Sequence, residues 1–119
     1  MKYYAGIGSR QTPKSLRPLI DKIVIMLNDK GYTLRSGGAE GADKFFESKA
    51  TLKEIFLPWE GYNGNPSPLF NTDTPELWEL AKKYHPSWNA LTQGAKKMMV
   101  SNGNQVLGKD LDCPVDFIV

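Results

Sequence analysis

The chain has little that would support covalent or metal-based stabilisation, because its 119 residues include one cysteine, Cys113, and one histidine, His85. A disulfide within this sequence is therefore excluded, and we expect no metal site built from cysteine and histidine ligands. Long apolar runs are also missing, and none approaches the roughly 18 residues of a membrane-spanning helix. The first residues form no apolar signal-peptide region, so we expect a cytoplasmic protein without a membrane partner.

A strong excess of one charge is absent as well. Lysine and arginine total 15 and aspartate and glutamate 13, which gives a formal net charge of +2. This excess is too small to indicate nucleic-acid binding unless it gathers on one face. The 40% hydrophobic and 24% charged residues are typical of a folded globular chain. The length predicts a single domain, residues 1–119, with a core that needs no covalent support.

Short apolar segments alternate with helical patterns along the chain. Helices are expected at 15–29, around Phe45 and Phe46, from a Thr74 cap to about 84, and over 88–99, and strands at 2–7, 32–35, 52–57 and 115–119. A long loop rich in glycine, asparagine and proline occupies 59–73. Alternating strands and helices predict an α/β fold class, namely a Rossmann-like three-layer fold with a mainly parallel sheet of about four strands.

The first candidate ligand loop follows the first predicted strand. Its ligand-binding candidates are Gly6, Gly8, Ser9 and Arg10. Glycines let a ligand approach the backbone closely, and free amides before a helix attract anions. The arginine can bind phosphate through two parallel hydrogen bonds. The third glycine of the dinucleotide fingerprint is missing, so a merely tight strand-to-helix turn explains the segment equally well.

The second candidate loop, residues 36–43, contains three glycines after the second predicted strand. Such a loop can form a nest of amides for phosphate or carbonyl oxygen. Both loops follow strands of one parallel sheet, so we expect them side by side at its carboxyl edge, where ligands bind in open α/β sheets. The candidate ligand-binding residues here are Ser36, Gly37, Gly38, Gly41 and Asp43.

Three further side chains have two interpretations each. Glu40 and Asp43 are weak catalytic candidates that could activate water, but carboxylates at a helix start also complement its dipole. Trp59 follows the third predicted strand and is a ligand-binding candidate that could stack on a base. Large aromatic side chains more often cover a sheet edge, and that alternative stays open.

The segments GIGSRQTP, LRSGGAEGAD, LPW, HPSW and QVLGKDL together resemble the SLOG superfamily. That superfamily includes DprA-type DNA-processing proteins and LOG-type nucleotide enzymes, and the likeness is closest to small phage-type proteins labelled "DNA recombination-mediator protein A-like". The resemblance implies a Rossmann-like sheet that binds nucleotides through the two glycine loops. The chain differs from longer relatives in lacking their last helix, in having Ser101 before Asn102, and in lacking the proline-glycine-glycine loop of LOG-type enzymes.

From these observations we expect a protein that binds a nucleotide or nucleotide-derived small molecule, without a cofactor, and that in a phage sequesters a signalling nucleotide. One alternative is a DprA-like recombination mediator that binds single-stranded DNA through Arg10, Arg35 and the lysine pairs at 82–83 and 96–97. Another is a LOG-type hydrolase of N-glycosidic or phosphoester bonds. An exposed edge at the last predicted strand also predicts a homo-oligomer.

Overall fold

The computed structural model describes residues 2–70 and 75–119. The strands are β1 (Lys2–Ala5), β2 (Tyr32–Ser36), β3 (Lys53–Ile55) and β4 (Phe117–Ile118), and the helices are α1 (Arg17–Asp29), α2 (Ala42–Lys49), α3 (Pro75–Tyr84) and α4 (Gln93–Leu107). Short 3-10 turns lie at Lys14–Leu16, Tyr62–Gly64 and Trp88–Ala90. The predicted cap at Thr74 and the end of the predicted loop, 71–73, lie outside the described residues.

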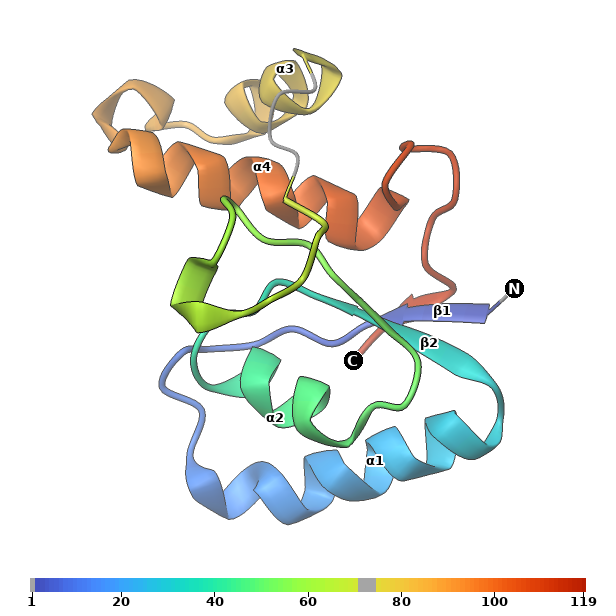
Figure 1. The fold of residues 1–119 in the computed structure, drawn as a ribbon. Coiled ribbons are helices and arrows are strands. Elements are labelled where there is room, and N and C mark those ends of the chain that lie inside the picture. The colour runs from blue at the N-terminus through green and yellow to red at the C-terminus, as the bar shows by residue number, and fades with distance from the viewer. Residues whose placement is uncertain (1, 71–74) are drawn as a thin grey trace.

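All four strands are parallel and follow the order β3-β2-β1-β4. Helices α1 and α2 cover one face of the sheet, and α4 with α3 lies over the other (Figure 1). The predicted α/β class with a parallel sheet of about four strands in three layers is confirmed. Because the strands are parallel, the segments that follow β1 and β2 leave the sheet at the same edge.

The apolar core lies between the sheet and the pair α1 and α2. In α1, the buried side chains recur at helical spacing, which is why this segment packs as an amphipathic helix. Pro18 sits in the first turn of α1, where its missing N–H removes no helical hydrogen bond. The buried core residues are Tyr4, Ile20, Val24, Leu27, Leu34, Ala42, Phe46, Ile55 and Leu57.

The opposite face of the sheet meets α4 through polar side chains. Ser101, Asn104 and Gln105 of this helix are each less than 5% exposed. The Asn104 amide donates to the carbonyl of Gly108 at 3.2 Å, so a buried polar group is satisfied at the helix end. Farther from the sheet, Leu77 of α3 packs with Trp88 and Val100 in a second, smaller apolar cluster.

Arg35 anchors the C-terminal segment to this polar layer. It is 2% exposed, and its Nε donates to the Glu54 carboxylate at 2.9 Å. Its guanidinium also donates to the carbonyl of Cys113 and lies 3.8 Å from the centroid of the Tyr3 ring. These contacts connect β2 to the chain that leads into β4. They also remove Arg35 from the cations available to a DNA strand.

Several predicted boundaries differ from the structure. The predicted helix 88–99 is wrong, because a 3-10 turn at 88–90 is followed by a new helix, α4, which extends to Leu107. Thr92 caps that helix by accepting from the Ala95 amide at 3.1 Å. The predicted strand 115–119 is shorter, because only Phe117 and Ile118 pair with β1.

Strand β4 forms one edge of the sheet, and Ile118 is 54% exposed there. An exposed strand edge invites pairing with another chain, so self-association stays a prediction. Within the described residues, none of the helices has the length and apolar character required to cross a membrane.

The buried hydroxyl of Tyr4 allows a test of how the core is packed. Its oxygen is buried without a hydrogen-bond partner among the described residues, and burial raises the pKa of Tyr4 to about 12. A buried polar group without a partner carries an uncompensated desolvation cost. Tyr4→Phe should therefore leave the free energy of unfolding unchanged or raise it by up to about 1 kcal/mol. Urea denaturation measures this, with Tyr84→Phe at a 72% exposed position as the control. A loss above about 1 kcal/mol in Tyr4→Phe would show that the hydroxyl has a partner.

Candidate functional site

The two glycine loops touch each other at the carboxyl edge of the sheet. The Ala42 amide, in the first turn of α2, donates to the Ser9 carbonyl at 3.2 Å. Gly8 lies so close to α2 that a Cβ there would stand 2.6 Å from the Cβ of Ala42. A Cβ on Gly41 would stand 2.5 Å from the carbonyl oxygens of Ser9 and Arg10. Glycine at positions 8 and 41 is thus required by the close approach of one backbone to another.

A cleft of about 480 Å³ opens beside this contact. The first loop contributes Ile7, Gly8 and Arg10, and the second contributes Ala39 and Asp43. The third wall is the face of α4 that carries Met98, Met99, Asn102, Gln105 and Val106. The two predicted loops therefore share one cleft, and α4 closes it from the other side of the sheet.

The first loop, whose Gly8 and Arg10 line the cleft, carries backbone donors without an internal acceptor among the described residues. The Ser9 hydroxyl accepts from the Gln11 amide at 3.0 Å, and the Ser9 carbonyl accepts from the Thr12 amide and hydroxyl, which fixes the turn. Among residues 2–70 and 75–119, no acceptor is bonded to the amides of Gly8, Ser9 and Arg10. The Arg10 guanidinium donates only to the Met98 sulfur at 3.4 Å, a weak acceptor, and has no carboxylate partner in this part of the chain.

In the second loop, a side chain accepts a hydrogen bond from the loop's own backbone. The Asp43 carboxylate accepts from the Ala39 amide at 3.2 Å. We expect the amides of this loop to face the same external anion as the first loop, but at Ala39 an internal carboxylate takes that place. Burial raises the pKa of Asp43, hydrogen bonding from the backbone amides of Ala39 and Gly37 opposes this effect, and the charge of Glu47 adds to it.

Other predicted residues hold the loops rather than line the cleft. The buried Ser36 hydroxyl donates to the Gly6 carbonyl at 2.7 Å, which joins the ends of β1 and β2. A Cβ on Gly6 would collide with the ring of Phe46, so packing explains this glycine. At Gly37, the nearest atom to such a Cβ is Nε2 of Gln105, at 2.5 Å. A side chain at Gly37 would therefore push the Gln105 amide out of its place on α4.

Glu40 and Trp59 lie outside the cleft. Glu40 is exposed and forms an ion pair with Lys44 at 2.8 Å, one helical turn further along the chain. Trp59 packs its ring edge-to-face against Tyr62, with the centroids 5.0 Å apart, and its other edge approaches Gly94 at the start of α4. The structure therefore does not bring Trp59 to the predicted crevice, and its ring lies beside the first turn of α4.

Sequence reasoning missed the contribution of α4. Asn102 and Gln105 are amides that could equally make turns or meet a base edge. They lie on the helix wall of the cleft, where Nε2 of Gln105 donates to the side-chain oxygen Oδ1 of Asn102 at 3.2 Å. Thr92 as a helix cap and Gly108 as a helix end were the signals that could have identified this helix. Within the described residues, no group of three or more histidine, cysteine, aspartate or glutamate side chains is arranged to hold a metal ion.

Comparison with known proteins gives no match: neither a family model, nor a curated protein, nor a solved structure is similar to this chain. The resemblance to the SLOG superfamily therefore stays a prediction. The chemistry of the cleft is judged from its own geometry.

The contact between the two loops predicts a large effect of a single methyl group at Gly41. Gly41 and Gly31 both have a φ near +80°, but among the described residues no atom lies within 4 Å of a Cβ on Gly31. Gly31→Ala should cost about 1–2 kcal/mol, the penalty for a left-handed backbone. Gly41→Ala should cost about 3 kcal/mol or more, because the methyl group also displaces the first loop and because the Gly41 backbone, with φ 81° and ψ −128°, lies in a region that only glycine adopts readily. Urea denaturation compares them, and equal losses would contradict the close contact.

Burial of Asp43 predicts a pH dependence of stability. Its pKa is above 3.8 in the folded chain, so folding binds a proton between pH 3.8 and the folded pKa. The contribution of Asp43 to the free energy of unfolding is then largest below pH 3.8 and falls as the pH rises through that window. The unfolding free energy of Asp43→Asn, relative to wild type, should therefore increase from pH 4 to pH 7 in urea titrations.

Glu40→Gln is the matched control for that experiment, since it removes one carboxylate from the exposed start of the same helix. The prediction is contradicted if the stability of Asp43→Asn relative to wild type falls with rising pH, or rises no more than that of Glu40→Gln. Burial of Asp43 would then not be a cause of the pH dependence of stability.

Proposed function

We propose that the cleft between the two loops and α4 binds a nucleotide-derived small molecule, with its phosphate on the first loop. The observation that carries this proposal is the set of open donors at that loop. The amides of Gly8, Ser9 and Arg10 have no acceptor among the described residues, and the Arg10 guanidinium has no carboxylate partner there. Grouped amides and an arginine are the donors that proteins use for phosphate.

The second loop favours a different part of the ligand. The Asp43 carboxylate repels a phosphate placed beside it, whereas a ribose hydroxyl can donate to a carboxylate oxygen. The ligand is therefore oriented with its phosphate toward residues 8–10 and its sugar toward Asp43.

The wall formed by α4 suits a nucleobase. Met98, Val106 and, across the cleft, Ile7 supply apolar surface, while the amides of Asn102 and Gln105 supply donors and acceptors. Small-molecule sites commonly combine a mainly apolar lining with a few polar groups that fix the orientation. The resemblance of GIGSR and SGGAEGAD to the SLOG superfamily supports the same ligand class, and sequestration of a signalling nucleotide is the role that we assign to it.

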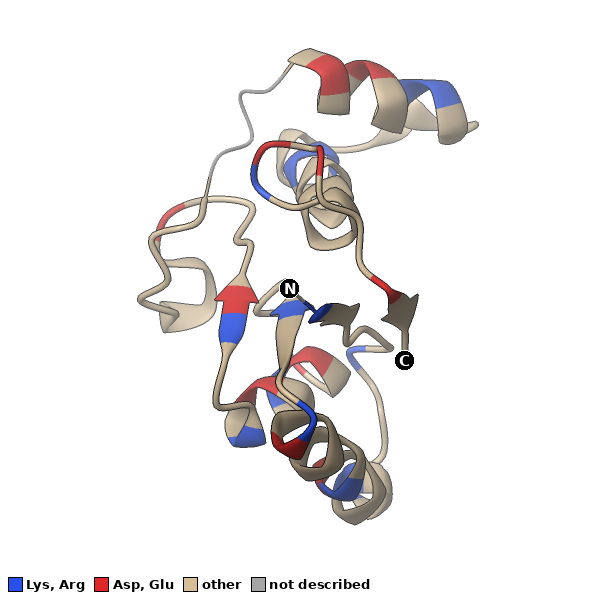
Figure 2. Ribbon diagram, turned by 90° about the vertical axis from the view of Figure 1, so that its right-hand side faces the viewer, with Lys and Arg blue, Asp and Glu red and all other residues tan. Residues whose placement is uncertain are grey.

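The alternatives have less support. A LOG-type hydrolase would need an activated carboxylate, but Glu40 is exposed outside the cleft and Asp43 is bonded to its own loop. For DNA binding, Arg35 is buried, and charges of both signs occur on the helices on both sides of the sheet (Figure 2). Binding of a small molecule without turnover needs neither feature.

Arg10 tests the proposal. Calorimetry with AMP, GMP, CMP, UMP and the parent nucleosides should detect binding of at least one nucleotide, and Arg10→Gln should weaken it by about tenfold or more, because a charged hydrogen bond to phosphate is lost. The affinity for the matching nucleoside should change little. Lys14→Gln, which removes an exposed cation outside the cleft, is the matched control.

Two outcomes would contradict the proposal. One is a folded protein that binds none of these compounds at about 1 mM, the weak end of specific affinity. The other is a nucleotide affinity that Arg10→Gln and Lys14→Gln reduce equally, which would indicate a general charge effect.

A further inference from the structure

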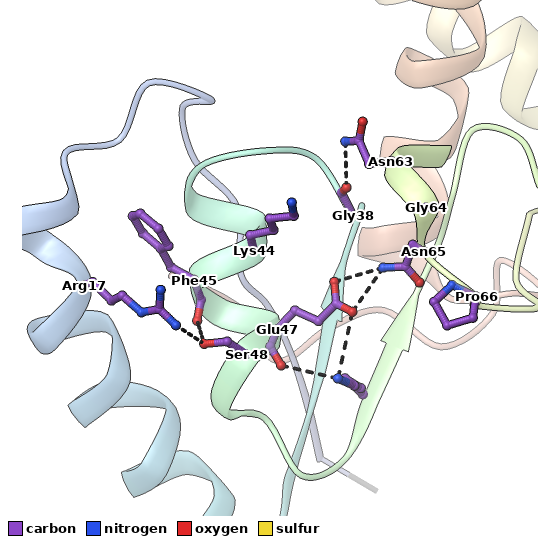
Figure 3. A pocket seen from close by; sticks show the side chains of 11 residues that line it. Arg17, Gly38, Lys44, Phe45, Glu47, Ser48, Asn63, Gly64, Asn65 and Pro66 are labelled. Carbon is purple, nitrogen blue, oxygen red and sulfur yellow. Dashed lines mark hydrogen bonds and ion pairs between the residues drawn. The ribbon is translucent and has the colours of Figure 1, made fainter. Parts of the chain in front are cut away.

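A second cavity, of about 420 Å³, lies behind the second glycine loop. It is bounded by α2, by Arg17 at the start of α1, and by the segment 63–66 (Figure 3). Gly38 and Lys44 line this cavity, whereas Ala39 and Asp43 line the first cleft. None of the described residues lines both spaces, so they are separate sites on opposite sides of the same loop.

One side of this cavity is a network of polar groups. The Glu47 carboxylate accepts from the Asn65 amide at 3.0 and 3.1 Å and lies 3.8 Å from the Lys53 ammonium. The Asn63 amide donates to the Gly38 carbonyl at 3.1 Å. In Figure 3 the Glu47 and Asn65 side chains point toward one another, and Asn63 points to Gly38. Hydrogen-bond donors and acceptors thus alternate along one wall.

The backbone at Asn63 indicates that this wall is held in place. Its φ of 53° and ψ of 28° are in the left-handed region, which asparagine visits more readily than most residues. The bond from its side chain to Gly38 connects this turn to the second glycine loop. The amide group is therefore positioned by both its backbone and its hydrogen bond.

The opposite rim is apolar and cationic. The Arg17 guanidinium lies 5.6 Å from the centroid of the Phe45 ring and donates to the Ser48 hydroxyl at 3.2 Å. Among the described residues Arg17 has no carboxylate partner, so most of its donors are open. The Lys44 ammonium is paired with Glu40, but that pair is more than half exposed and therefore weak.

We propose that this second cavity binds a phosphorylated sugar. Vicinal hydroxyls each offer a donor and two acceptors, which the Glu47 carboxylate and the Asn63 amide can match. The Phe45 ring and Pro66 give an apolar surface for the C–H face of the sugar. The phosphate lies at the rim, where Arg17 binds it through parallel hydrogen bonds.

The site is tested by ¹⁵N NMR titration of the whole chain with glucose 6-phosphate, glucose and inorganic phosphate. Glucose 6-phosphate should shift the amides of Gly38, Lys44 and Asn65 and should bind more tightly than the other two probes. Arg17→Gln should weaken the affinity for glucose 6-phosphate by about tenfold, because one charged hydrogen-bonding group is lost. The affinity for glucose should not change. Lys22→Gln, an exposed cation on the same helix outside the cavity, is the control.

Asn63→Gly is the second variant, because glycine accepts the left-handed backbone while the side-chain amide is lost. This variant should weaken the binding of both glucose and glucose 6-phosphate. The proposal is overturned if these amides do not shift at about 10 mM, a concentration above even very weak affinities. It is also overturned if Arg17→Gln and Lys22→Gln have equal effects. Shifts confined to Ile7 and Gln105 would place glucose 6-phosphate in the first cleft and would also overturn the proposal. Nucleotide binding to the first cleft is measured separately by calorimetry, so the two proposals fail independently.

Discussion

The hydrogen bond from the Ala42 amide to the Ser9 carbonyl is the contact on which both sites depend. It brings the loop after β1 against the loop after β2, and it forms only because Gly8 and Gly41 have no side chains between the backbones. The same contact fixes the start of α2, whose first residues line the first cleft on one side and the second cavity on the other. A parallel pair of strands places the loops at one edge, and this bond sets their spacing.

The first cleft is asymmetric because the two loops differ in how their backbone amides are hydrogen-bonded. The loop at 8–10 leaves its amides open, whereas Asp43 fills the corresponding position in the loop at 36–41. A cleft with donors on one wall and a carboxylate on the other distinguishes the two ends of a ligand. The buried polar face of α4, with Gln105 beside Gly37, extends this pattern to the third wall.

Much of the fold could be predicted from the sequence because the spacing of apolar residues reflects which side chains are buried. The pattern in α1 has one buried apolar stripe, and the prediction agrees with the structure to within a turn. Helix α4 was misplaced because its inward face carries Ser101, Asn104 and Gln105, which leave no apolar period to follow. The glycine patterns predict the positions of both loops. A glycine required by packing, such as Gly6 against Phe46, looks the same in the sequence as a glycine required for ligand binding, and only the structure distinguishes the two. The place of Trp59 depended on a loop conformation that sequence patterns do not determine.

The central claim is that the first loop holds the phosphate of a bound nucleotide. The most direct measurement is a crystal structure of the protein grown with the nucleotide that binds most tightly in calorimetry. The account predicts phosphate oxygens within about 3 Å of the Gly8, Ser9 and Arg10 amides, the usual length of such hydrogen bonds, with the sugar beside Asp43. A phosphate on the far side of the second loop, or a nucleotide bound outside the cleft, would contradict it.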